Sequence, residues 1–96
     1  MGKRIMVVDD EYDVCFVLGE VLGENGYVVD SYGDPFLALS KFKADLYDLA
    51  ILDIKMPELN GFALYREFKR LDKKVKVCFL TAGEMFTANI QIYFLH

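Results

Sequence analysis

The segment Leu49 to Gly61, LAILDIKMPELNG, constrains the fold more than any other part of the chain. Its four apolar residues, Leu49 to Leu52, are typical of a fully buried strand, and Asp53 stands at the end of that strand. A loop marked by Pro57 follows, and a helical pattern begins at Gly61. Burying an ionised carboxylate costs free energy unless a cation or hydrogen-bond donors meet it. We therefore expect Asp53 to belong to a functional site.

A second apolar strand, Ile5 to Val8, also ends in acidic residues. Three of them follow it directly, Asp9, Asp10 and Glu11. Taken alone, this run also fits the N-terminus of a helix, where the helix dipole favours negative charge. If the two strands lie side by side, however, Asp10 and Asp53 face one another and repel. A hard divalent cation such as Mg²⁺ would relieve that repulsion.

The rest of the chain alternates between strand and helix patterns. We predict strands at 3–8, 27–30, 49–52 and 75–80, and helices from residue 11 or 12 to 25 or 26, and at about 35–44 and 61–71. The apolar spacing predicts that the helices bury Val14, Val17, Leu18, Val21 and Leu22, then Ala38, Leu39 and Phe42, then Leu64, Phe68 and Leu71. This order favours an α/β fold, a doubly wound parallel sheet with right-handed crossovers and helices on both faces. Ligands bind such sheets at the carboxyl ends of the strands, where Asp53 and Thr81 stand.

Composition narrows the class of protein. The 96 residues fit one domain, 1–96, and 54% of them are hydrophobic, which excludes a disordered chain. No apolar run resembles a membrane span or a signal peptide, so we expect a cytoplasmic protein without membrane contact. Cys15 and Cys78 lack metal-ligand spacing and are interpreted as reduced core residues.

Charge is distributed unevenly. Residues 1–60 hold 12 acidic and 5 basic side chains, whereas residues 61–96 hold 3 acidic and 6 basic ones. The overall net charge of −4 argues against direct contact with nucleic acid, because cations supply most of the non-specific affinity for phosphates.

Three motifs together resemble the receiver domains of two-component response regulators. They are VVDDE at 7–11, LDIKMPELNG at 52–61 and FLTA at 79–82, in the order and spacing of that family. The resemblance covers residues 3 to about 84. It implies a flavodoxin-like fold with strand order 2-1-3-4, in which the fifth strand and the last helix are missing or altered.

The resemblance also implies roles for individual residues. By it, Asp53 is the phosphoacceptor, aspartyl phosphorylation requires Mg²⁺, and the donor is a sensor histidine kinase or a small phosphodonor. The metal ligands are Asp10, Asp53 and the backbone carbonyl of Lys55. The remaining pocket residues are Asp9, Thr81, which looks like the switch hydroxyl, and Ala82. Such a domain catalyses only its own phosphoryl transfer and dephosphorylation, so we do not expect a turnover enzyme.

Departures from the family pattern keep alternatives open. The family continues through a fourth helix, a fifth strand bearing a lysine and a fifth helix, whereas here no lysine follows Lys76 and the sequence stops at His96. A truncated domain is the simplest interpretation; one alignment instead places Tyr93 at the family's aromatic switch and His96 at its lysine. A pseudo-receiver, an interaction module without phosphate signalling, is the alternative function. A haloacid-dehalogenase-like phosphatase is disfavoured, because Lys55 stands where its second Asp is needed.

The C-terminal segment suggests self-association. If the strand Val75 to Leu80 is left as an open edge, it becomes a template for pairing with another chain. The segment Ile90 to Leu95 can fold back beside that edge or cross to a neighbour. We expect a dimer in which residues 84–96 form the contact.

Overall fold

The computed structural model describes residues 3–81 and 84–87, and the structural statements below refer to these residues. Five strands form one sheet in the order β2-β1-β3-β4-β5. The elements are β1 (Arg4–Val8), α1 (Tyr12–Glu24), β2 (Val28–Tyr32), α2 (Pro35–Lys41), β3 (Leu49–Asp53), α3 (Gly61–Leu71), β4 (Lys76–Thr81) and β5 (Glu84–Thr87). The first four strands are parallel. The predicted α/β class and the strand order 2-1-3-4 are confirmed.

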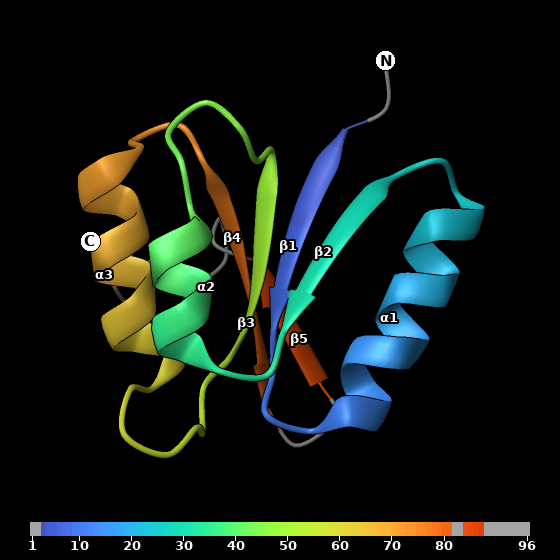
Figure 1. The fold of residues 1–96 in the computed structure, drawn as a ribbon, viewed down its shortest axis with the longest axis horizontal. Helices are drawn as coiled ribbons and strands as arrows, with labels where there is room; N and C mark the ends of the chain where they lie inside the picture. The colour runs from blue at the N-terminus through green and yellow to red at the C-terminus, as the bar shows by residue number, and fades with distance from the viewer. Residues whose placement is uncertain (1–2, 82–83, 88–96) are drawn as a thin grey trace.

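The helices cover the two faces of the sheet unequally. Figure 1 shows α2 and α3 packed side by side on one face and α1 on the other. The larger core lies under α2 and α3 and includes Ala38, Leu64, Phe68 and Phe79, all of them fully buried. A smaller core lies under α1 and includes Ile5, Val7, Cys15, Ile51 and Cys78. Both cysteines are therefore buried core residues, as predicted.

Side-chain caps hold the first turns of α2 and α3. Asp34 accepts a hydrogen bond from the backbone nitrogen of Phe36 at 2.9 Å, and Pro35 occupies the first turn of α2. Asn60 caps α3 in the same way, by accepting from Ala63 at 2.9 Å. The second helix ends at Lys41, three residues before the predicted end. The backbone of Phe42 is already extended, and its ring stacks on that of Phe68 with the centroids 4.1 Å apart.

The predicted buried face of α1 is partly wrong. Val17 is 56% exposed and Val21 is 50% exposed, whereas Cys15, Leu18 and Leu22 contact the smaller core. The helical period was correct, but α1 is the only described helix on its face of the sheet, so no second helix covers its flank. Leu71, predicted to be buried in α3, is also exposed, at 42%.

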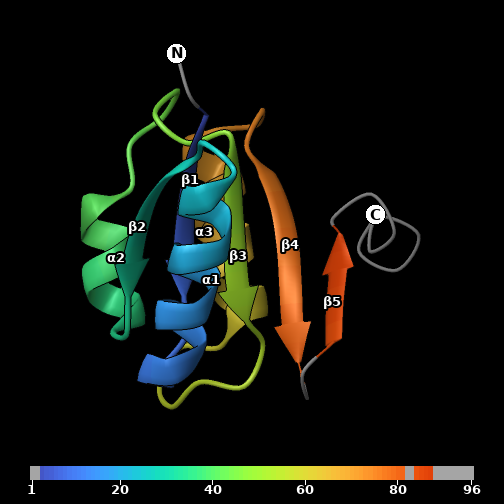
Figure 2. The ribbon, with the colours of Figure 1, turned by 90° about the vertical axis from the view of Figure 1, so that its right-hand side faces the viewer.

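The predicted open edge at β4 is wrong as well. Strand β5 pairs with it antiparallel, from Thr81 opposite Glu84 to Cys78 opposite Thr87 (Figure 2). Only two residues separate the two strands, and so short a connection allows a hairpin but no parallel crossover. The other predictions for the C-terminal segment, including those for Tyr93 and His96, fall on residues outside those described.

Candidate functional site

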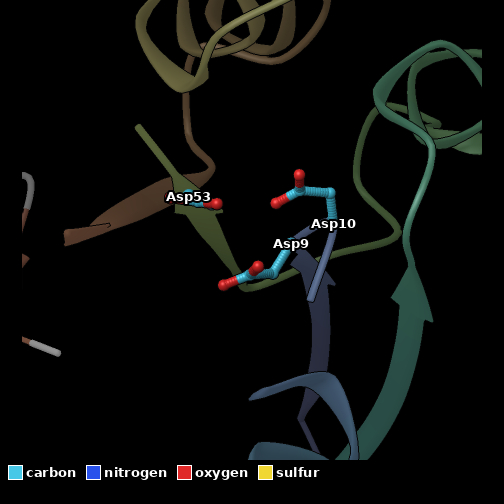
Figure 3. Close-up of side chains that lie close together, drawn as sticks. All are labelled: Asp9, Asp10 and Asp53. Atoms are coloured by element: carbon cyan, nitrogen blue, oxygen red, sulfur yellow. The ribbon is translucent and has the colours of Figure 1, made fainter. Parts of the chain in front are cut away.

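Three carboxylates meet at the carboxyl end of the sheet. In the register of the parallel strands Val8 lies beside Leu52, so the residues that follow them, Asp9 and Asp53, are neighbours. One oxygen each from Asp9, Asp10 and Asp53 lies within 4.8 Å of the others. Figure 3 shows the side chains of Asp9 and Asp10 leaving the end of β1 and that of Asp53 leaving β3. The structure thus brings together the three acidic residues that the sequence singled out.

The three carboxylates differ in exposure and in hydrogen bonding. Asp9 is only 3% exposed, and its Oδ1 accepts a hydrogen bond from the backbone nitrogen of Glu11 at 2.8 Å. Asp53 is partly buried, and its Oδ1 accepts from the backbone nitrogen of Lys55 at 3.2 Å. Asp10 is exposed to solvent. The site therefore has a buried floor at Asp9 and an open side at Asp10.

Negative charge accumulates at this site. Burial, followed by the charge of Asp9, raises the pKa of Asp53 to about 6. Burial also raises the pKa of Asp9, although the hydrogen bond from the Glu11 backbone opposes the shift. The two ion pairs in the described part of the chain, Arg4 with Asp30 and Arg70 with Glu67, do not reach the site. The cluster is thus suited to a cation from solution.

The arrangement fits a magnesium ion. Mg²⁺ prefers oxygen ligands at about 2.1 Å and keeps several waters, so it needs only a few carboxylates on one side. The three carboxylates supply such oxygens within 4.8 Å of one another. The exposed side at Asp10 leaves space for water and for an incoming phosphate.

For the other predicted site residues, Lys55, Thr81 and Ala82, the structure gives a position in the chain's fold for the first two only. Lys55 is exposed and follows Asp53 in the loop after β3. Thr81 is the last residue of β4, one position after Leu80, which pairs with Asp53. Ala82 lies outside the described residues. The roles of all three remain predictions.

Gly61 allows the loop after β3 to return to the end of that strand. A Cβ atom at this position would lie 2.4 Å from the backbone oxygen of Asp53. The backbone nitrogen of Gly61 donates to the oxygen of Ile54 at 3.1 Å, which closes the loop. Met56, in the same loop, is buried in the larger core. The first turn of α3 is thereby held directly against the main chain of the candidate acceptor.

A cavity of about 270 Å³ lies beside the acidic site, and sequence reasoning missed it. Its lining consists of Asp9, Asp10, Tyr12, Cys15, Phe16, Ser31 and Gly33. Within it the Sγ of Cys15 donates to the backbone oxygen of Asp9 at 3.3 Å, so α1 supports the floor of the site. The sequence carries no signal for this contact, because helical periodicity does not say which flank of α1 turns toward β2.

The chain is a doubly wound α/β protein in which carboxylates lie together at the ends of two adjacent parallel strands. The sequence pattern of the response regulator receiver domain family matches residues 5–93. The chain is 31% identical over 86 residues to sporulation initiation phosphotransferase F of Bacillus subtilis. This alignment covers 88% of this chain and 69% of that protein. The chain belongs to the response regulator receiver domain family.

Other relatives are longer proteins or have solved structures. Regulatory protein VanRB of Enterococcus faecalis is 41% identical to this chain over 69 residues. The alignment covers 72% of this chain but only 31% of that longer regulator. The response regulator TrrA of Thermotoga maritima, whose structure was solved with Mg²⁺ and BeF, is 41% identical to this chain. The two structures superpose with a TM-score of 0.75 over 83% of this chain and 70% of TrrA. A second TrrA structure, in complex with the histidine kinase ThkA, gives 43% identity and a TM-score of 0.76 over 85% of this chain and 71% of that one.

No helix among residues 3–81 and 84–87 is both long enough and apolar enough to cross a membrane.

Proposed function

We propose that this chain is a phosphoacceptor domain that accepts a phosphoryl group on Asp53 in a reaction that depends on Mg²⁺. The observation that carries the proposal is the convergence of Asp9, Asp10 and Asp53 at the carboxyl end of β1 and β3. Family membership supports it, because receiver domains are the parts of two-component systems that accept the phosphoryl group. The TrrA structure with Mg²⁺ and BeF supports the choice of metal.

Each carboxylate has its own part in the proposed reaction. An oxygen of Asp53 forms a bond to phosphorus, and the bond from phosphorus to the donor breaks, so that the donor leaves with the electron pair. A pKa of about 6 leaves Asp53 mostly ionised near pH 7, as a nucleophile must be. The backbone of Lys55 orients this carboxylate through its hydrogen bond to Oδ1.

Asp9 and Asp10 would hold the metal together with Asp53 and the carbonyl of Lys55. When bound, Mg²⁺ screens the negative charge of the phosphoryl oxygens as they approach three carboxylates. Asp9 is kept in place by the Glu11 backbone, and Asp10 faces the solvent from which a donor arrives. The Thr81 hydroxyl is proposed to hydrogen-bond the transferred group beside Ala82.

A sensor histidine kinase is the proposed donor, supported by the TrrA–ThkA complex. Small phosphodonors such as acetyl phosphate are the second proposed source. A cytoplasmic location stays a prediction. Self-association through residues 84–96 also stays a prediction, and the pairing of β4 with β5 removes the open edge on which it rested.

A pseudo-receiver is the second candidate function. A pseudo-receiver would bind neither Mg²⁺ nor a phosphate analogue at the acidic site.

The mass of the intact protein after incubation with acetyl phosphate and Mg²⁺ tests the proposal. We expect the added mass of one phosphoryl group on Asp53, no addition in Asp53→Asn, and none when the metal is chelated. Asp13→Asn, which changes another aspartate of the acidic half, is the matched control and should be labelled like the parent. Labelling at another aspartate, or none under conditions that label TrrA, would contradict the proposal.

A further inference from the structure

The sequence holds two Asn-Gly dipeptides, Asn25-Gly26 and Asn60-Gly61. In such a dipeptide the backbone nitrogen of the glycine can attack the side-chain amide carbon of the asparagine, because no Cβ hinders the approach. A carbon–nitrogen bond forms in a cyclic imide, and the bond to the side-chain nitrogen breaks. That nitrogen takes up the proton of the glycine amide and leaves as ammonia. Water then opens the imide to aspartate or isoaspartate, each with one new negative charge.

The first dipeptide lies at the end of α1, where two hydrogen bonds hold its reacting groups apart. Asn25 is the last cap residue, and its Nδ2 donates to the backbone oxygen of Val21 at 2.7 Å. The backbone nitrogen of Gly26 donates to the oxygen of Gly23 at 3.0 Å. Gly26 has a φ of 89°, in the left-handed region that favours glycine after a helix. The glycine that ends the helix is therefore also the one that makes Asn25 reactive.

The surroundings of this dipeptide are open. Asn25 and Gly26 are both exposed, and a Cβ at Gly26 would meet nothing within 4 Å. In Figure 1 this end of α1 lies at the outer edge of the molecule, where the chain turns into β2. Fraying of a helix end costs little free energy, and here it breaks both hydrogen bonds without opening the core. The glycine nitrogen is thereby released toward the amide carbon of Asn25.

The second dipeptide has the same chemistry but different surroundings. Asn60 accepts a hydrogen bond from Ala63 at 2.9 Å, and the nitrogen of the buried Gly61 donates to the oxygen of Ile54 at 3.1 Å. A Cβ at Gly61 would lie 2.4 Å from the backbone oxygen of Asp53. Releasing the Gly61 nitrogen therefore requires the first turn of α3 to leave the end of β3. That opening disrupts the larger core and costs far more than fraying.

From this contrast we propose that Asn25 is a site of spontaneous deamidation in the folded protein, while Asn60 is protected. The product lacks the Nδ2 donor to Val21 and places a negative charge at the C-terminus of α1, where the helix dipole disfavours it. Isoaspartate also adds a carbon to the main chain. The end of α1 is thus loosened irreversibly. The modification lies at the end of the sheet opposite Asp53, so this proposal does not depend on phosphorylation.

The two dipeptides serve as each other's control in one experiment. The native protein is kept folded in mildly alkaline buffer, digested at intervals, and assayed by mass spectrometry for conversion at each asparagine. We expect Asn25 to react at least about tenfold faster than Asn60, because fraying needs less free energy than opening the core. In concentrated urea the two rates should become similar, since an aromatic residue follows each Asn-Gly. Equal rates in the folded protein, or faster reaction at Asn60, would overturn the proposal.

Two variants test the consequence for α1. Asn25→Asp mimics one product, and Asn25→Ser also removes the Nδ2 donor but adds no charge. We expect faster amide hydrogen exchange at Gly26 and Tyr27 in Asn25→Asp than in Asn25→Ser, because only the aspartate opposes the helix dipole. On isoelectric focusing, a more acidic form should accumulate with time in the parent but not in Asn25→Ser. An acidic form that accumulates equally in Asn25→Ser would place the reaction elsewhere, and equal exchange in the two variants would refute the loosening of α1.

Discussion

At the scale of single residues, the charge on Asp53 is expected to destabilise the metal-free protein. Its pKa is raised to about 6 by burial and by the charge of Asp9. Above that pH the folded protein therefore holds an ionised, partly buried carboxylate beside Asp9, which costs free energy. We predict that Asp53→Asn is more stable than the parent at pH 7.5 without divalent cations, by about 1 kcal/mol after allowance for solvent screening. The gain should shrink as the pH falls toward 5, because the parent then takes up the proton in its folded state.

Denaturant unfolding at a series of pH values measures this effect. Glu20→Gln, an exposed change on α1, is the matched control and should shift stability little at any pH. Adding Mg²⁺ should reverse the order, because only the parent gains from binding the ion in its folded state. A variant less stable than the parent at pH 7.5 without metal would contradict the raised pKa.

Gly61 offers a second prediction at this scale. In Gly61→Ala the new methyl group would lie 2.4 Å from the backbone oxygen of Asp53, so the loop or the strand end must shift. We expect a loss of about 1 to 3 kcal/mol in unfolding free energy and weaker Mg²⁺ binding, measured by calorimetric titration.

Gly19→Ala is the matched control for that change. A Cβ at position 19, within α1, meets nothing within 4 Å. This substitution should stabilise the protein by about 0.5 to 1 kcal/mol, because alanine is the better helix former, and should leave Mg²⁺ binding unchanged. Equal effects of the two substitutions would show that close packing at Gly61 is unimportant.

At the scale of elements, a polar network joins three segments at the end of the sheet opposite the site. Asp30 in β2 accepts from Arg4 of β1 at 2.9 Å and from the hydroxyl of Tyr47, which precedes β3, at 2.6 Å. Burial acts to raise the pKa of Asp30, but these hydrogen bonds outweigh it, so the pKa is lowered. The ionised form of Asp30 therefore stabilises the fold, and this contribution is lost as the pH falls through its lowered pKa.

We predict that Tyr47→Phe costs about 1 kcal/mol in unfolding free energy at pH 7, because Asp30 loses a buried donor. The difference from the parent should diminish in acid, once Asp30 is protonated in both proteins. Tyr27→Phe, at a residue that is 38% exposed, is the control and should cost less. A constant difference from pH 7 to pH 3 would rule out Asp30 as the group involved.

The helices show what the local spacing of apolar residues can and cannot predict. Apolar spacing located the three helices that the described residues form, and Leu64 and Phe68 of α3 are buried as predicted. The same spacing predicted burial of Val17 and Val21, which are exposed. Periodicity tells which residues share a face of a helix, but burial depends on what packs against that face.

At the scale of the whole molecule, charge should govern how tightly the metal binds. The part of the chain that carries the site, residues 1–60, holds 12 acidic and 5 basic side chains. At low salt their field extends well beyond the three carboxylates, with a Debye length of about 30 Å at 0.01 M compared with about 8 Å at 0.15 M. We predict that Mg²⁺ binds several-fold more weakly at the higher salt concentration in calorimetric titrations. An affinity independent of salt would mean that only the direct ligands contribute.

The sequence by itself determined the order of the elements, the parallel sheet and the end of the sheet at which the acidic residues lie. It could do so because parallel strands end at a common edge, so Asp9, Asp10 and Asp53 lie at the same end of the sheet. They come together because β1 and β3 are also adjacent strands, which is a property of the sheet order. Only the tertiary structure decided that Asp9 is buried while Asp10 is exposed, that the pKa of Asp53 rises to about 6, and that β5 closes the edge of β4. These properties depend on contacts between segments distant in the chain, and a local pattern of apolar and charged residues does not encode such contacts.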